Sequence, residues 1–142
     1  MNFYGLGVKY GKVDDKSSDF FKYNFWTTGW KADDKKEYQK LILDAAVGDI
    51  VFVKSFTQYY PEKMHIKAFG IIKSKVLPEN IPEEYKGSMG FEIVWLKVLD
   101  EDYIYETGNS LMPNHTDRLN SIYIETDEKL KEELWNLLDY KK

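Results

Sequence analysis

The chain has 142 residues, 43% of them hydrophobic and 31% charged, with a net charge of −4; this balance is typical of one compact globular domain over residues 1–142. The absence of cysteine excludes disulfides, thiolate metal sites and cysteine nucleophiles. The negative charge argues against a protein that follows a long phosphate backbone. No apolar run approaches the roughly 18 residues that span a bilayer, so we expect a cytoplasmic protein without a membrane partner.

Aromatic residues are in excess, and the charge is unevenly distributed. Eleven tyrosines, eight phenylalanines and four tryptophans make up 16% of the chain, so some rings should be exposed, where they can stack on planar ligands. Residues 1–75 contain 13 lysines and nine acidic residues, whereas residues 76–142 contain seven basic and 15 acidic residues. An anionic ligand should therefore prefer the first half of the chain.

The first third of the chain predicts a strand, an aromatic segment and a helix. Residues 3–10 read as a strand and residues 11–18 as a loop. Residues 20–30 are the densest aromatic segment and show neither strand alternation nor helical spacing. A helix should begin near Asp33 or Asp34, because apolar side chains then recur with the spacing of one helix face. They are Tyr38, Leu41, Ile42 and Ala45.

The segment VGDIVFVKSF, residues 47–56, is the one around which we expect the fold to be organised. Gly48 and Asp49 signal a turn before a strand. Apolar residues at consecutive positions from Ile50 predict burial on both faces of that strand. The strand ends in Lys54 and Ser55, which suits either the wall of a small-ligand pocket or a core strand whose last residues reach water.

The remaining chain predicts mostly strands. We expect strands at residues 64–75, 91–99 and 119–125, and a turn with a short return strand at residues 100–105. Residues 59–63 and 106–118 read as loops. Thr126 is a suitable N-cap for a terminal helix, whose apolar face is formed by Leu130, Leu134, Leu137 and Leu138. The sum is an α+β domain with about six strands in a curved mixed or antiparallel sheet, or a small barrel, and two helices.

Four segments follow one another along the chain: FWTTGW at 25–30, VGDIVFVK at 47–54, IKAFGII at 66–72 and FEIVW at 91–95. In this order they resemble the PUA-like superfamily, and within it the EVE-type domains, which are related to YTH domains, and their relatives in restriction-linked proteins. The resemblance spans roughly residues 3–99. It implies a PUA-like curved sheet and nucleic-acid binding, with one modified base held in an aromatic cage in the EVE and YTH branches.

Trp26 and Trp30 are the centre of the predicted site. Gly29 permits a turn between them, which would point both indoles into one space where a nucleobase is sandwiched. The alternative is that both indoles cap the core beneath the following helix.

Residues from the same two segments complete the predicted site. Amide and hydroxyl groups would read a base edge, although the threonines are also suited to capping the loop backbone. Lysine and serine at the strand end would bind a phosphate, and an aromatic ring would close the pocket. These residues are Asn24, Thr27, Thr28, Lys54, Ser55 and Phe56.

Three functions are compatible with these features. The first is a non-enzymatic module that binds DNA or RNA by holding one, modified, base. The second is a pocket for a free nucleotide or a nucleotide-derived signal. The third is a hydrolase or nuclease acting on such ligands. No cofactor, metal or catalytic residue is expected, because His65 and His115 lack partners at ligand spacing and the sequence lacks nucleotide-binding and hydrolase motifs.

Overall fold

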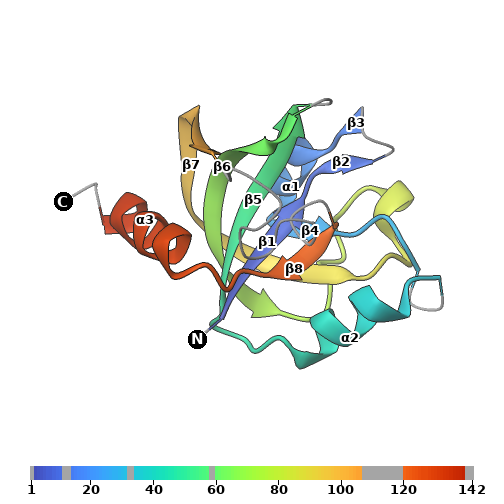
Figure 1. The fold of residues 1–142 in the computed structure, drawn as a ribbon. Coiled ribbons are helices and arrows are strands. Elements are labelled where there is room, and N and C mark those ends of the chain that lie inside the picture. The colour runs from blue at the N-terminus through green and yellow to red at the C-terminus, as the bar shows by residue number, and fades with distance from the viewer. Residues whose placement is uncertain (1, 11–13, 32–33, 58–59, 107–119, 140–142) are drawn as a thin grey trace.

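The computed structural model describes residues 2–10, 14–31, 34–57, 60–106 and 120–139 (Figure 1). Its strands are β1 (Phe3–Gly7), β2 (Lys9–Tyr10), β3 (Asp14–Asp15), β4 (Phe25–Thr27), β5 (Ile50–Thr57), β6 (Tyr60–Ser74), β7 (Gly90–Glu106) and β8 (Ile122–Ile124). Its helices are α1 (Ser17–Tyr23), α2 (Lys36–Asp44), the short 3-10 helix η1 (Glu83–Tyr85) and α3 (Glu128–Asp139).

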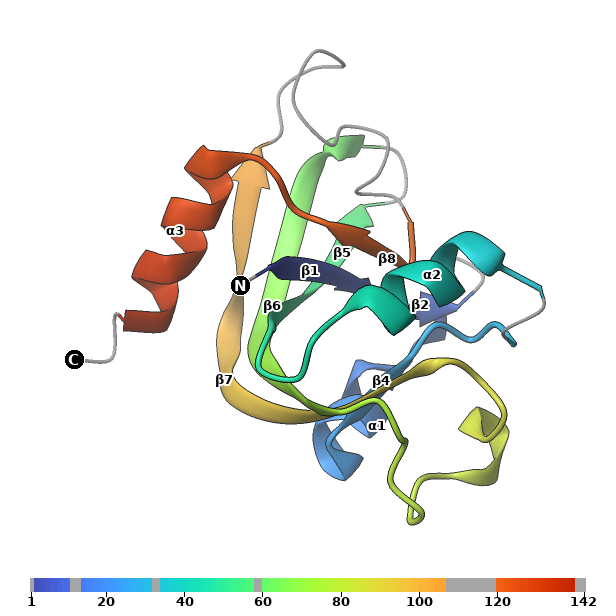
Figure 2. The ribbon, with the colours of Figure 1, turned by 90° about the horizontal axis from the view of Figure 1, so that it is seen from below.

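One curled, mixed sheet carries the fold. Its six strands lie in the order β4-β7-β6-β5-β1-β8, and β2 pairs with β3 separately. β1 runs parallel to β5, whereas the other neighbours in the six-stranded sheet are antiparallel. Figure 2 shows β6 and β7 bending strongly, so that the sheet closes partly on itself. The predicted α+β class with a curved sheet of about six strands is therefore confirmed.

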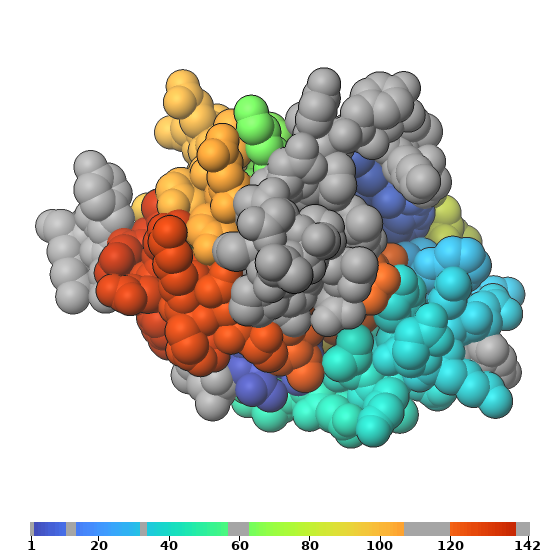
Figure 3. Space-filling model, viewed as in Figure 1, coloured from blue at the N-terminus to red at the C-terminus, as the bar shows by residue number. Residues whose placement is uncertain are grey.

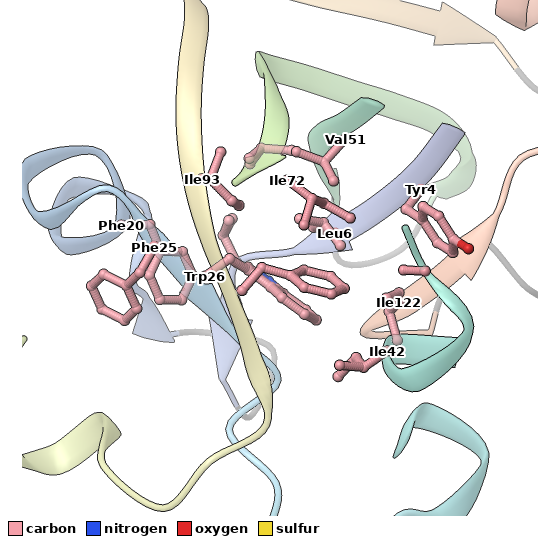
Figure 4. Packing of buried hydrophobic residues seen from close by; sticks show 14 of the residues in the cluster. Tyr4, Leu6, Phe20, Phe25, Trp26, Ile42, Val51, Ile72, Ile93 and Ile122 are labelled. Carbon is pink, nitrogen blue, oxygen red and sulfur yellow. The ribbon is translucent and has the colours of Figure 1, made fainter. Parts of the chain in front are cut away.

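The strand β5 is buried on both faces. Val51 and Val53 of β5 face one apolar cluster, which α1 and α2 complete with residues such as Phe20 and Ile42 (Figure 4). Ile50 and Phe52, which alternate with these valines, face a second cluster that two leucines of α3 complete. The double burial expected from the apolar sequence of this strand is confirmed.

The Gly-Asp turn before β5 has a structural role. Gly48 adopts a positive φ of 98°, which a side chain disfavours. The buried carboxylate of Asp49 accepts hydrogen bonds from the backbone N–H of Asn2, at 3.2 Å, and of Ala46, at 3.0 Å. Asp49 therefore ties the start of β1 to the end of α2, so this motif contributes to the fold and not to a ligand site.

The prediction of two helices was wrong, because α1 begins within the predicted loop and continues into the aromatic segment. The helix has only seven residues, too few for a helical period to stand out among aromatic neighbours. Asn24 ends it in the left-handed conformation, with φ 59°, which asparagine tolerates better than most residues. The chain then enters β4 directly.

Three boundaries also differ from the predictions. β7 is continuous through Glu106, without the turn predicted at residue 100, because β6 pairs with it again from Tyr103 to Glu106 after a register shift between Ile66 and Ala68 of β6. Tyr60 begins β6, although a loop was predicted there. The side chain that caps α3 is Asp127, not Thr126, since Asp127 Oδ1 accepts a hydrogen bond from Lys129 N at 3.1 Å. Residues 107–118 of the second predicted loop lie outside the described residues.

Candidate functional site

Trp26 belongs to the core. Its side chain is 0% exposed, it stacks on Phe91 with 5.8 Å between ring centres, and its Nε1 donates to the carbonyl oxygen of Gly7 at 2.7 Å. Figure 4 shows the indole among apolar side chains of the first cluster. The cage of two facing indoles is therefore a wrong prediction, because pairing of β4 with β7 turns this side chain inward. The alternative of a core-capping indole is correct for Trp26.

Trp30 has the opposite environment, with 42% of its surface exposed. Gly29, at φ 81°, forms the turn that separates the two tryptophans. The Thr28 hydroxyl accepts from Trp30 N at 2.9 Å and donates to Trp30 O at 3.1 Å. The same carbonyl accepts from Met89 N at 3.0 Å. The backbone beneath the exposed indole is therefore fixed, and the predicted alternative of Thr28 as a local backbone cap is confirmed.

Two residues near α2 extend the site around Trp30. Lys35 Nζ lies 4.8 Å from the centre of the Trp30 ring and 6.0 Å from that of the Tyr38 ring, which are distances of cation–π contacts. We call these three residues the Trp30–Lys35 surface. Sequence reasoning missed Lys35, because nothing in the sequence distinguishes it from Lys31 or Lys36.

Thr27 and Asn24 do not form a base-reading edge with Thr28. Thr27 is buried, and its hydroxyl contacts the Tyr10 hydroxyl, which also donates to the Thr27 carbonyl oxygen at 3.1 Å. Burial raises the pKa of Tyr10 to about 12, so this hydroxyl keeps its proton. Asn24 is exposed at the end of α1, and its carbonyl oxygen accepts from Ile93 N at 3.0 Å.

Lys54 is buried, with 3% exposure, so the prediction of a cation at an accessible strand end was wrong. The reason is that β5 continues to Thr57 and places Lys54 inside the strand. Its Nζ donates to the Asn120 carbonyl oxygen and lies 5.6 Å from the centre of the Tyr123 ring. Burial lowers the pKa of Lys54 to about 7.

Ser55 and Phe56 continue β5 after Lys54. Ser55 is buried opposite His65 of β6, and Phe56 packs against the second apolar cluster. The backbone of Gly7 lies close to both Lys54 and Trp26. A Cβ at Gly7 would lie 3.6 Å from Lys54 Nζ, and Gly7 O is the acceptor of the Trp26 indole. The structure thus brings these two predicted residues near one another, but in the interior.

In the described part of the chain, no group of three or more histidine, aspartate or glutamate side chains is arranged to hold a metal ion. In the same part, helices that combine the length and the apolarity needed to cross a membrane are absent.

Comparisons with known proteins identify a similar fold but no related sequence. No family model matches the chain, and no curated protein matches it in sequence. A crystal structure of the Mmi1 YTH domain is similar over 99% of this chain and 97% of that chain, with 13% identity and a TM-score of 0.54. A second structure of the Mmi1 YTH domain, and one of its complex with RNA, give TM-scores of 0.41 and 0.37 at 13% and 12% identity. These two cover 83% of this chain and 72% and 74% of theirs. The first similarity shows that the curled sheet with its three helices is a YTH-like fold.

Proposed function

We propose that this protein is a nucleic-acid-binding module in which one base of DNA or RNA stacks on Trp30 and the adjoining phosphate meets Lys35. The observation that carries the proposal is the exposed Trp30 indole with Lys35 Nζ at 4.8 Å from its ring centre. A flat ring beside a cation is the combination with which proteins hold single-stranded nucleic acid. The YTH-like fold supports the same class of ligand, through the resemblance described above.

The backbone of Trp30 is held by hydrogen bonds in the protein without a ligand, and this order favours binding. The Thr28 hydroxyl accepts a hydrogen bond from the Trp30 N–H and donates one to the Trp30 carbonyl oxygen. The backbone N–H of Met89 donates to the same carbonyl oxygen. Ordering a loop on binding costs affinity, so a backbone that is already fixed leaves more of the stacking free energy for the complex.

A footprint of one base is compatible with the net charge of −4. A protein that covers many phosphates needs a broad basic surface, whereas one stacked base and one phosphate need only the Trp30–Lys35 surface. Lys54 is not part of this surface, because its Nζ is buried against Asn120.

A finer proposal is that the base is modified and that the chain is an EVE-type member of the PUA-like superfamily. This part rests on the resemblance of the sequence segments alone. It is tested by comparing two oligonucleotides that differ only by a modification on one base, against a panel of modifications. Equal affinity for every pair would refute the finer proposal and leave the stacking proposal intact.

The test of the stacking proposal compares Trp30→Ala with Trp135→Ala. The two indoles are equally accessible, at 42% and 44%, but Trp135 lies on α3. Stacking of one base is worth about 1–3 kcal/mol, so Trp30→Ala should weaken binding of a fluorescent single-stranded oligonucleotide by about 5- to 150-fold. Trp135→Ala should leave the affinity unchanged. Equal effects of both substitutions, or none of either, would refute the proposal.

The remaining alternative is a pocket for a free nucleotide. Comparing the affinities of a mononucleotide and an oligonucleotide distinguishes it from nucleic-acid binding. Contact with one or a few phosphates predicts that oligonucleotide affinity falls with salt, with a slope of roughly −0.7 per phosphate for a single strand. The mononucleotide should bind more weakly than the oligonucleotide. If the mononucleotide binds as tightly, the protein is instead a receptor for a free nucleotide.

A further inference from the structure

The helix α3 carries a tryptophan outside the face that packs on the core. Leu130 and Leu134 of this helix are fully buried in the second apolar cluster, whereas Trp135 is 44% exposed. In Figure 3 the atoms of α3 lie at the surface, next to atoms from the start of the chain in blue. Because tryptophan is enriched in binding surfaces, the surroundings of this ring are a candidate for a second site.

Trp135 lines an open pocket with a volume of about 330 Å³. Phe3 of β1 also lines it, with three charged side chains of α3, namely Glu128, Lys131 and Glu132. The rings of Phe3 and Trp135 meet edge to face, with 5.2 Å between their centres and 74° between their planes. Since Phe3 is itself buried, this contact holds the indole against the core. The volume is at the lower end of the range for small-ligand sites, about 300–1,000 Å³, and therefore suits a single side chain.

The charges that line the pocket favour a cation. Lys131 Nζ forms an ion pair with Glu128 Oε1 at 2.9 Å, so these two charges compensate each other. Among the described residues, the side chain of Glu132 has no ion-pair or hydrogen-bond partner. Residues three apart on a helix are neighbours on its surface, so this carboxylate lies beside the Trp135 ring. The pocket thus combines one uncompensated negative charge with an accessible aromatic ring.

A guanidinium group matches this combination better than an ammonium group does. It is planar and weakly hydrated, so it can stack on an indole, and its parallel N–H donors match the two oxygens of a carboxylate. An ammonium group is a strongly hydrated point charge without a flat face. Because the pocket is open to the surface, an arginine side chain can enter it while the main chain of that arginine stays outside.

We propose that this pocket binds one arginine side chain of a partner polypeptide. The guanidinium would stack on Trp135 and form hydrogen bonds with the carboxylate of Glu132, while Lys131 stays paired with Glu128. The attraction between a cation and an indole adds to the charge-assisted hydrogen bonds. This pocket is separate from the Trp30–Lys35 surface, and the inference does not depend on the function proposed for that surface.

The experiment uses the full chain, labelled with ¹⁵N, and three blocked tripeptides that differ only in their central residue. The central residue is arginine, citrulline or lysine, each between two glycines. Citrulline has the shape of arginine without its charge. We expect the arginine peptide, titrated to millimolar concentration, to shift the indole N–H signal of Trp135 with saturation. The citrulline peptide should leave this signal in place, and the lysine peptide should bind more weakly than the arginine peptide.

Substitutions assign the two contacts, with binding followed through backbone amide signals of α3. Trp135→Ala should weaken binding of the arginine peptide by about 2- to 30-fold, and Glu132→Gln by about two- to fivefold. The matched controls are Trp30→Ala, at an indole of similar exposure, and Glu37→Gln, at an exposed carboxylate of α2. Both controls should bind the peptide as the parent does.

Several outcomes would overturn the proposal. They are the absence of a Trp135 shift with the arginine peptide, equal binding of the citrulline or the lysine peptide, and unchanged affinity in Trp135→Ala or in Glu132→Gln. Thermal unfolding checks that both variants are folded. Since Glu132→Gln keeps the shape of an exposed side chain, it tests the charge of the pocket even if Trp135→Ala loses stability.

Discussion

Removal of the Trp26 side chain should lower the melting temperature of the protein considerably, because this indole lies in the core. Trp26→Ala deletes a fully buried ring that stacks on Phe91 at 5.8 Å. Truncation of a buried tryptophan to alanine costs about 3–5 kcal/mol. A domain of this size has a free energy of unfolding of about 5–15 kcal/mol, so the variant should keep only part of its stability.

The hydrogen bond of Trp26 can be tested separately from its packing. Trp26→Phe keeps an aromatic ring next to Phe91 but leaves the Gly7 carbonyl oxygen without the 2.7 Å bond from Nε1. Loss of a buried hydrogen bond of this kind costs about 1–3 kcal/mol. Trp30→Ala changes an exposed side chain and should alter stability by no more than about 0.5 kcal/mol.

Thermal and urea unfolding followed by circular dichroism measure these differences. For a chain of this length, 1 kcal/mol shifts Tm by about 2–4 °C, so Trp26→Ala should melt about 6–20 °C below the parent. The order of stability should be parent and Trp30→Ala, then Trp26→Phe, then Trp26→Ala. A Trp26→Ala variant that melts with the parent but no longer binds an oligonucleotide would refute the assignment of Trp26 to the core.

Three further substitutions test other parts of the structure. Gly90→Ala should destabilise the fold by about 1–3 kcal/mol or more in urea unfolding, because its Cβ would lie 1.9 Å from the Trp26 carbonyl oxygen; a neutral effect would contradict this packing. Burial lowers the pKa of Lys54 from 10.5 to about 7, so the unfolded chain binds more protons between these values and the free energy of unfolding should rise with pH across that range. That rise should be smaller in Lys54→Met, and an identical pH profile would show that Lys54 is accessible. Asp127→Ala should cost about 1 kcal/mol or more, because it removes the cap bond to Lys129 N and the acceptor of the Tyr105 hydroxyl, whereas Asp127→Asn should retain most of the stability.

Much of the fold could be predicted from the sequence, since the strongest signals are those of long buried elements. The apolar run from Ile50 has no polar face, so it predicts a strand covered on both sides, and two clusters do cover it. The spacing of Tyr38 and Ile42 predicts α2. The incorrect predictions concern segments whose conformation is decided by pairing with a distant strand. The long partner strand β6 keeps β7 extended past Asp100, and no local pattern reports such a partner.

The candidate site could be predicted only in part. The turn at Gly29 and the exposure of Trp30 agree with the sequence reasoning, but the assignment of both indoles to one slot does not. Aromatic residues four apart can share a helix face or lie on opposite sides of a turn, and their separation alone does not decide which. The pairing of β4 with β7, together with the Gly7 acceptor, sends Trp26 inward. Lys35 precedes the first residue of α2 and contacts Trp30, and the composition of its segment does not reveal this contact.

The central claim is that nucleic acid meets this protein at Trp30, and the four tryptophans provide the most direct test of it. Each indole N–H gives its own signal in a ¹H–¹⁵N correlation spectrum, so one titration with a single-stranded oligonucleotide observes all four rings, assigned by single Trp→Phe substitutions. The account predicts that the Trp30 signal shifts most, while the signals of Trp26 and Trp135 stay close to their initial positions. A titration in which Trp26 or Trp135 shifts and Trp30 does not would contradict it.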